Sequence, residues 1–169
     1  PKDIATLAYI SGVPLIVMQE NAKYFTNPNA PPGLGIGPWN TMIPERELLN
    51  ASFAVPGLAP NADTLYNAAW LNLTAEPVVL KVPPIPGRYY TFQFNDAYGS
   101  TAAYVGSRTT GSDGGTYFIT GPEWNGQIPD EMTEIKLPTN LIWIQGRILV
   151  KGPADVPNVH AIQDQISLN

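Results

Sequence analysis

Apolar side chains recur at intervals of three and four along the first 26 residues, which is the spacing of a helix. The pattern predicts helix over residues 3–26, and Asp3 stands where an acid favours a helix N-terminus. Gly12 and Pro14 interrupt the pattern, so we expect two helical pieces that meet at a bend. The apolar positions are Ile4, Leu7, Ala8, Ile10, Leu15, Ile16, Met18, Ala22 and Phe25.

The next segment, residues 27–38, holds four prolines and three glycines and predicts an extended arm without regular structure. A short helix is expected from Pro44 to Leu49, because proline suits the first position of a helix. A second terminal helix is expected from Pro157 to Leu168, where Val159, Ile162 and Ile166 recur at helical spacing.

Beyond residue 50 the hydrophobic period changes from helical spacing to two, which predicts strands. The clearest case is residues 89–95, where Tyr90, Phe92 and Phe94 alternate with polar side chains. These aromatic residues, together with Tyr89, are expected in the core and in cross-strand pairs. The glycine-rich run 111–115 is typical of a hairpin turn. The predicted strands are 65–73, 78–82, 89–95, 101–105, 116–120, 141–144 and 147–150.

Short strands separated by turns predict a mainly β protein, an antiparallel β-sandwich or barrel-like domain with helices at both ends. We divide the chain into a helical segment and arm, residues 1–38, and a β-rich domain, residues 39–169. A chain of 169 residues is long enough for one domain with its own core.

Composition excludes several classes of protein. The net charge of −5 argues against nucleic-acid binding, and no apolar run reaches the roughly 20 residues of a membrane-spanning helix. Cysteine is absent and His160 is the sole histidine, which excludes disulfides, thiolate sites and zinc sites with two histidines. We therefore expect neither a metal nor a cofactor.

The chain begins at Pro1 without a methionine, and a cleaved signal peptide is our first explanation, with a sequence trimmed at its start as the alternative. Two triplets, Asn50-Ala51-Ser52 and Asn72-Leu73-Thr74, match the acceptor pattern for N-glycosylation. We therefore predict an extracellular or cell-surface protein with glycans as candidate partners at Asn50 and Asn72.

Several sequence strings occur in an order that is similar to a known family. They are Asn61-Ala62-Asp63-Thr64-Leu65-Tyr66 with Ala69-Trp70-Leu71, Glu76-Pro77-Val78-Val79-Leu80, Gly87-Arg88-Tyr89-Tyr90, Arg108-Thr109-Thr110-Gly111, residues 138–147 (PTNLIWIQGR), Asp155-Val156-Pro157-Asn158-Val159 and Ala161-Ile162-Gln163-Asp164-Gln165. With them the chain resembles domain of unknown function 1254, from the segment around Gly12 to Gln165.

The resemblance implies a β-rich domain, in agreement with the period-two pattern, and implies no reaction. Members of the family usually carry a second domain C-terminal to this one. Two positions depart from the family pattern: Ala62, where arginine is usual, and Asn72, where aspartate is usual. Any role of that arginine is therefore lost here.

Polar residues in the β-region form the best candidate site. One interpretation is an arginine-lined pocket for an anion, with Asp63 or Asp96 as a base. The other, which we favour, is a structural network of arginines and carboxylates that ties strands together. The cluster comprises Asn61, Asp63, Thr64, Tyr66, Arg88, Asp96, Arg108 and Arg147.

No complete catalytic set is apparent, and we assign no catalytic residue. None of the serines lies in the G-x-S-x-G pattern, and His160 falls in the predicted terminal helix, where a surface or capping role is expected. A pair of carboxylates could hydrolyse glycosides, but a sequence does not fix their separation. The carboxylates in question are Asp63, Asp96, Glu123 and Glu134, and a carbohydrate platform would draw on Trp39, Trp70, Trp124 or Trp143.

Two functions follow from these observations. We favour a non-catalytic subunit that assembles with copies of itself, for instance into an extracellular fibril or surface layer, by docking its N-terminal segment on a neighbour. The alternative is a hydrolase-like enzyme or a module that binds a small anion or carbohydrate at the arginine and aspartate cluster. The residues expected to carry the assembly are Ile4, Leu7, Leu15, Ile16 and Phe25.

Overall fold

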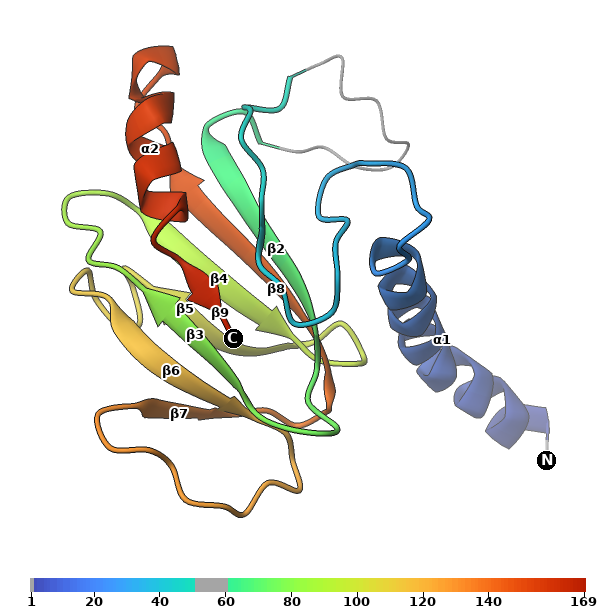
Figure 1. Ribbon diagram of the computed structural model, residues 1–169. Helices are drawn as coiled ribbons and strands as arrows, with labels where there is room; N and C mark the ends of the chain where they lie inside the picture. Colours follow the sequence, from blue (N-terminus) through green and yellow to red (C-terminus); the bar gives the residue numbers. More distant parts are fainter. Residues whose placement is uncertain (1, 51–60) are drawn as a thin grey trace.

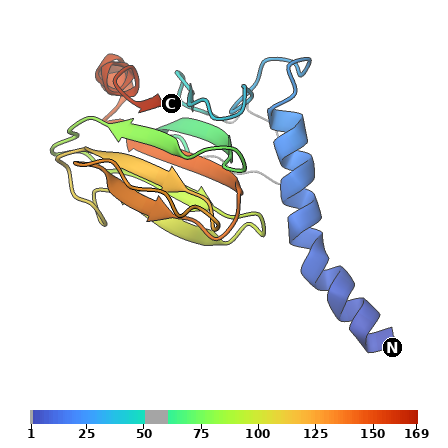
Figure 2. The same cartoon turned by 60° about the horizontal axis from the view of Figure 1, so that its bottom comes forward.

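The strands predicted beyond residue 60 form two sheets that pack face to face, as the computed structural model shows (Figures 1 and 2). The structure describes residues 2–50 and 61–169. The predicted fold class, a mainly β sandwich with terminal helices, is confirmed.

The larger sheet has five strands, all antiparallel to their neighbours. Its two longest members, β2 and β8, pair along nine positions, from Thr64 with Leu149 to Asn72 with Leu141. In spatial order the strands are β1 (Ile43–Pro44), β2 (Thr64–Asn72), β8 (Leu141–Leu149), β4 (Tyr90–Asn95) and β5 (Thr101–Gly106).

The sequence predicts two strands here, 141–144 and 147–150, but β8 is continuous through Gly146. A Cβ atom at Gly146 would lie 2.7 Å from the ring of Phe92, so glycine lets this ring pack against the middle of β8. Gly146 therefore does not break the strand, and its lack of a side chain makes room for the ring of Phe92.

The smaller sheet has four strands and mixes both pairing directions, because β6 and β7 are parallel whereas the other pairs are antiparallel. In spatial order it contains β7 (Thr133–Lys136), β6 (Gly115–Thr120), β3 (Val78–Val82) and β9 (Ser167–Leu168). The hairpin predicted at residues 111–115 is wrong, since β5 and β6 belong to different sheets. Gly111 and Gly114 adopt positive φ angles of 82° and 75° and turn the chain from one sheet to the other.

The core fills the space between the inner faces of the two sheets. Tyr90, Phe92 and Phe94 are fully buried there, as the alternation in β4 predicted. Tyr89 does not join them and is 37% exposed, because it precedes the strand and faces the opposite side. Burial raises the pKa of Tyr90, so its hydroxyl stays protonated and donates a 2.8 Å hydrogen bond to the carbonyl of Gly111.

A single helix, α1 (Lys2–Phe25), replaces the two pieces predicted at the N-terminus. Pro14 lies inside it, and the helix axis changes direction near its middle (Figure 2). Proline removes one backbone hydrogen bond but its φ angle fits a helix, so the element bends and continues.

The C-terminal half of α1 packs on the outer face of the larger sheet. Met18 and Ala22 are buried, and the ring of Phe25 stacks on Trp70, which in turn stacks on Trp143, with ring centroids 6.1 and 5.9 Å apart. We call Met18, Ala22 and Phe25 the seat of α1. The N-terminal half of α1 extends away from the sheets (Figure 2).

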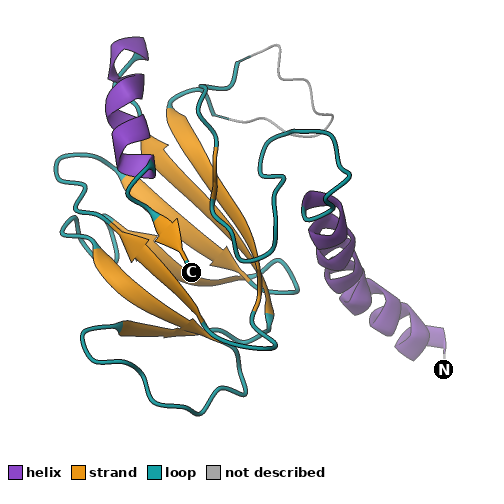
Figure 3. Ribbon diagram, viewed as in Figure 1, coloured by secondary structure: helices purple, strands orange, loops and turns teal. Residues whose placement is uncertain are grey.

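The proline- and glycine-rich segment after α1 is irregular, as predicted, but it is fastened to β2 (Figure 3). The backbone N–H of Asn40 donates to the carbonyl of Trp70, and its side chain exchanges two hydrogen bonds with the backbone of Asn72. The helix predicted from Pro44 to Leu49 is wrong. The backbone there pairs with β2 instead, and the N–H of Glu45 donates to Tyr66.

The C-terminal helix forms but is shorter than predicted. A single 3-10 turn (Pro153–Asp155) precedes α2 (Val156–Gln163), and the chain then pairs with β3 as β9. The chain turns after Gln163 and is extended again at Ser167 and Leu168, where the prediction had continued the helix.

Candidate functional site

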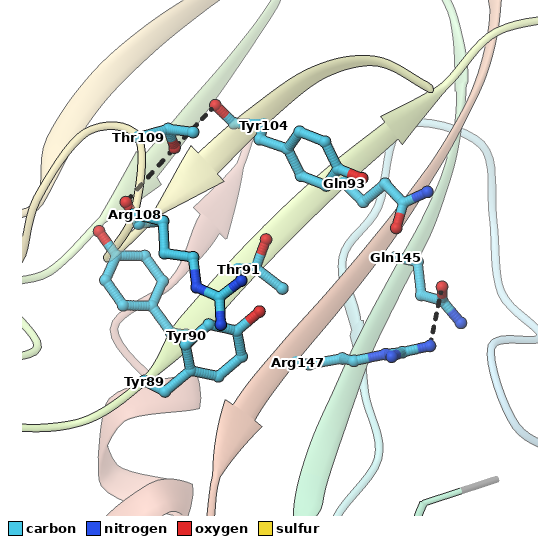
Figure 4. Close-up of a pocket in the computed structure, with 10 residues that line it drawn as sticks. Tyr89, Tyr90, Thr91, Gln93, Tyr104, Arg108, Thr109, Gln145 and Arg147 are labelled. Carbon is cyan, nitrogen blue, oxygen red and sulfur yellow. Dashed lines mark hydrogen bonds between the residues drawn. The ribbon is translucent and has the colours of Figure 1, made fainter. Parts of the chain in front are cut away.

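A hollow of about 410 Å³ lies on the outer face of the larger sheet, beyond the part that α1 covers (Figure 4). Strand register places its floor in two rows. Gly106, Thr91 and Arg147 form one row across β5, β4 and β8, and Tyr104, Gln93 and Gln145 form the next. Tyr89, Tyr90, Arg108 and Thr109 complete the lining.

Gly106 helps to create the hollow because it brings no side chain to the first row. A Cβ atom there would lie 2.5 Å from the carbonyl oxygen of Tyr90, so no other residue fits without a shift of the backbone. The loop after β5 then carries Arg108 and Thr109 to the rim of the hollow.

Two arginines give this hollow its charge. The guanidinium of Arg108 lies 5.5 Å from the ring centre of Tyr89, and that of Arg147 lies 5.5 Å from the ring centre of Tyr66. Within residues 2–50 and 61–169 neither arginine forms an ion pair, and the lining contains no carboxylate. The hollow is therefore a positive patch on a protein with a net charge of −5.

Two glutamines present fixed amide groups in the row beside the arginines. Arg147 donates to Oε1 of Gln145, which directs Nε2 of this glutamine away from Arg147. Gln93 donates through Nε2 to Asn95 and Thr101, which leaves its Oε1 as an acceptor. The second row thus offers one donor and one acceptor side by side.

Arg88, which sequence analysis grouped with these arginines, is used elsewhere. It forms a bidentate pair with Asp155, with N–O distances of 2.5 and 2.8 Å, and donates to the carbonyl of Leu149. The Arg88 guanidinium holds the pKa of Asp155 far below its usual range, helped by the N–H of Lys151 and the amide of Asn158. The hydrogen bonds that Arg88 donates to Asp155 in turn raise the pKa of Arg88.

The N-x-D-T-L-Y motif forms a turn that leads into β2. The side-chain oxygen of Asn61 accepts hydrogen bonds from the backbone of Asp63 and from both the backbone and hydroxyl of Thr64, while its amide donates to the hydroxyl of Tyr66 at 2.7 Å. Asp63 itself is exposed. The contacts of this motif are therefore those of a structural turn.

The remaining candidate residues do not gather into one site. Asp96 caps the turn between β4 and β5 by accepting from the N–H groups of Tyr98 and Ser100. Nε2 of His160 lies 2.7 Å from the carbonyl oxygen of Arg46, and a carbonyl only accepts, so this nitrogen carries the proton. Trp70 and Trp143 stack beneath α1, whereas Trp124 packs on Phe118 of the smaller sheet; the four tryptophans share no platform.

Asn50 and Asn72 are both exposed, and the side-chain oxygen of Asn72 accepts from the N–H of Thr74. Ala51 and Ser52, the rest of the first glycosylation triplet, lie outside the described residues, as does Pro1. Among the described residues, no group of three histidine or acidic side chains is placed to hold a metal ion. Within the same residues, no helix is both long and apolar enough to span a membrane.

Most of the residues that line the hollow were not predicted from the sequence. Arg108 and Arg147 were in the predicted cluster, but Thr91, Gln93 and Gln145 were not. The available signal was the polar side of the alternating strand, because every second residue of β4 faces away from the core. Pairing of this strand with β8, which the sequence did not reveal, brings the polar sides together.

Comparison with solved structures finds a crystal structure of the VPA0106 protein from Vibrio parahaemolyticus, with a TM-score of 0.78, 27% identity, and coverage of 99% of this chain and 37% of that one. A putative uncharacterized protein from Burkholderia cenocepacia gives a TM-score of 0.45 and 13% identity over 65% of this chain and 31% of that one. The chain thus spans little more than a third of the Vibrio protein. No curated protein matches it.

A family model described as "Protein of unknown function (DUF1254)" matches residues 39–169, which include the whole sandwich and both rows of the hollow. The match begins after α1 and the proline-rich segment. The chain belongs to the DUF1254 family.

Proposed function

We propose that the chain is a non-catalytic subunit that associates with a second copy of itself through helix α1. The observation that carries the proposal is the exposure of large apolar side chains on this helix, between 40% and 75% for each of them. They are Ile4, Leu7, Tyr9, Ile10, Val13, Ile16, Val17 and Tyr24.

The apolar side chains surround α1 instead of forming one stripe. Met18 and Ala22 face the sheet, whereas at about 100° per residue Val13 falls on the opposite side and Val17 on the flank. Residues 4–19 contain no charged side chain. A helix that is apolar on all sides is ordinarily buried on all sides, which supports a contact with another folded surface.

The domain itself does not provide that surface. At about 1.5 Å per residue the 24 residues of α1 extend for about 36 Å, and its seat lies entirely in the C-terminal third. The N-terminal half projects beyond the sheets (Figure 2), so it is positioned to reach a neighbouring molecule. Of the predicted assembly residues, Ile4, Leu7 and Ile16 are exposed, while Leu15 and Phe25 are half-buried.

The candidate catalytic groups give no support to the enzymatic alternative. Arg88 and Asp155 neutralise each other, and Asp96 caps a turn, so these side chains have structural partners. An extracellular location, fibril formation and glycans at Asn50 or Asn72 stay predictions from the sequence.

Light scattering coupled to size exclusion tests the proposal on the 169-residue chain. We expect the wild type to show a mass above the 18.3 kDa of one chain, increasing with concentration. The double variant Ile10→Gln, Val17→Gln removes two exposed apolar side chains and leaves the seat intact, so it should have the mass of one chain.

Ile128→Gln is the matched control, because Ile128 is 41% exposed on the connection between β6 and β7, away from α1. It should associate as the wild type does. A single-chain mass for the wild type at every concentration would refute self-association and assign α1 to a contact with a different folded unit. Electron microscopy of the associated sample would distinguish an open filament from a closed oligomer.

A further inference from the structure

The outer hollow of the larger sheet is independent of α1 and carries a different inference. Four arginines occur in the sequence, and all lie in the described residues. Arg46 pairs with Asp164 and Arg88 with Asp155, whereas Arg108 and Arg147 have no carboxylate partner. Both unpaired arginines line the same hollow.

The two guanidinium groups do not converge on one point. Figure 4 shows Arg108 and Arg147 on either side of Thr91, with Arg108 directed towards Tyr89 and Arg147 towards Gln145. Arg147 lies on β8 and Arg108 on the loop after β5, and β4 lies between these two strands. This arrangement suits a ligand with two separated negative groups better than a single small anion.

The row of side chains beside the arginines is polar but uncharged. Gln145 offers an amide donor and Gln93 an amide acceptor, in neighbouring positions of the second row. A hydroxyl group both donates and accepts, and a sugar ring carries several. Tyr104, 46% exposed at the end of the same row, adds a flat apolar face of the kind against which a sugar ring packs.

We propose that this hollow binds an acidic oligosaccharide. One carboxylate pairs with Arg108 and another with Arg147, while hydroxyl groups beside them bond to Gln93 and Gln145 and a ring packs on Tyr104. Each row measures about 10 Å across the three strands. The two rows lie about 7 Å apart along the strands, because their positions are two residues apart. These dimensions suit a short segment of an oligosaccharide.

Calorimetric titration with trigalacturonate at low salt, on the 169-residue chain, tests the proposal. We expect binding that weakens as salt is added and no binding of the neutral trisaccharide maltotriose. Arg108→Gln and Arg147→Gln should each reduce the affinity about tenfold or more, since each removes a charged hydrogen-bonding partner. Tyr104→Ala, on an edge strand, should weaken binding without loss of charge.

Arg46→Gln is the matched control, because this substitution removes the same charge from an arginine outside the hollow. This variant should bind trigalacturonate as the wild type does. Thermal unfolding verifies that each variant is folded. Because Arg108 is exposed, we expect Arg108→Gln to disturb the fold least. Equal affinity for maltotriose, unchanged binding by both arginine variants, or no binding of trigalacturonate at millimolar concentration would each overturn the proposal. If phosphate binds as tightly as trigalacturonate, the hollow is a simple anion site, and this result would also overturn the proposal.

Discussion

Arg88 and Asp155 show how one pair of charged residues holds two parts of the sandwich together. Their side chains are only 11% and 14% exposed, and the pair connects the start of β4 to the 3-10 turn that follows β8. The carboxylate also accepts from the N–H of Lys151 and the amide of Asn158, so each of its oxygens has a partner. Because all these donors favour the charged form, the pKa of Asp155 lies far below its ordinary value of 3.8.

A lowered pKa makes this stabilisation dependent on pH. The unfolded chain binds the proton more readily than the folded one, so the stabilisation is complete above about pH 5 and declines as the pH falls further. Asp155→Asn should lower the melting temperature at pH 7, and its difference from the wild type should shrink as the pH falls below about 5. Thermal unfolding followed by circular dichroism at several pH values measures this.

Asp164→Asn is the comparison variant, since Asp164 also pairs with an arginine but its side chain is 61% exposed. Exposed ion pairs contribute only about 0–1 kcal/mol to stability, so Asp164→Asn should lower the melting temperature less than Asp155→Asn does. Equal melting temperatures of Asp155→Asn and the wild type at pH 7 would show that the Arg88 pair does not stabilise the fold.

At the scale of elements, long strands with regular alternation were predictable from the sequence and short edge strands were not. β4 could be predicted because Tyr90, Phe92 and Phe94 share its buried side. β1 and β9 contain two residues each, and no period exists over two residues. They form because backbone groups of β2 and β3 lie beside them, which is a property of the tertiary structure.

The candidate site was predictable in its residue types and unpredictable in its grouping. Arg88, Arg108 and Arg147 look equivalent in the sequence, since each lies within or close to a predicted strand. Only the fold places Asp155 beside Arg88 and, within the part of the chain that the structure describes, leaves the other two without a carboxylate partner. Sequence spacing does not carry this information, because the partners of Arg88 come from a segment 67 residues away.

Helix α1 is an element with two different halves, and hydrogen exchange should distinguish them. Residues 18–25 contain the seat, whereas residues 2–17 contribute no fully buried side chain. In dilute protein we expect fast exchange of the amides in residues 2–17 and slower exchange in residues 18–25. In concentrated protein, association should slow exchange in residues 2–17.

Exchange in β5 provides an internal reference that concentration should not change. Rapid exchange of residues 2–17 at every concentration would contradict burial of this half of α1 between molecules. Slow exchange at every concentration, including dilutions where the protein has the mass of one chain, would mean that the helix is stable without a partner.

At the scale of the whole molecule, the sandwich and the projecting half of α1 are separable. A chain that begins at Met18 keeps the seat and both sheets and loses only residues 1–17. We expect it to unfold cooperatively at the melting temperature of the dilute wild type and to have the mass of a single chain. Thermal unfolding and light scattering measure the two properties.

The melting temperatures of the shortened chain and the wild type are compared at low protein concentration, because association by itself raises the melting temperature. Loss of cooperative unfolding in the shortened chain would show that residues 1–17 stabilise the sandwich directly. A shortened chain that still associates would place the self-contact on the sheets and not on α1.

The pairing of β2 with β8 has a consequence for synthesis of the protein in the cell. The central pair of the larger sheet joins residues 64–72 to residues 141–149, so about 70 residues separate the two strands. A ribosome adds about 5–20 residues per second, which leaves β2 without this partner for about 4–14 s. During that interval β2, an aromatic and apolar strand, has left the ribosome, and its backbone groups have no β8 to pair with. Mispairing and capture by chaperones therefore compete with folding at this strand, and the time needed to translate β8 sets the earliest moment at which the sandwich can close.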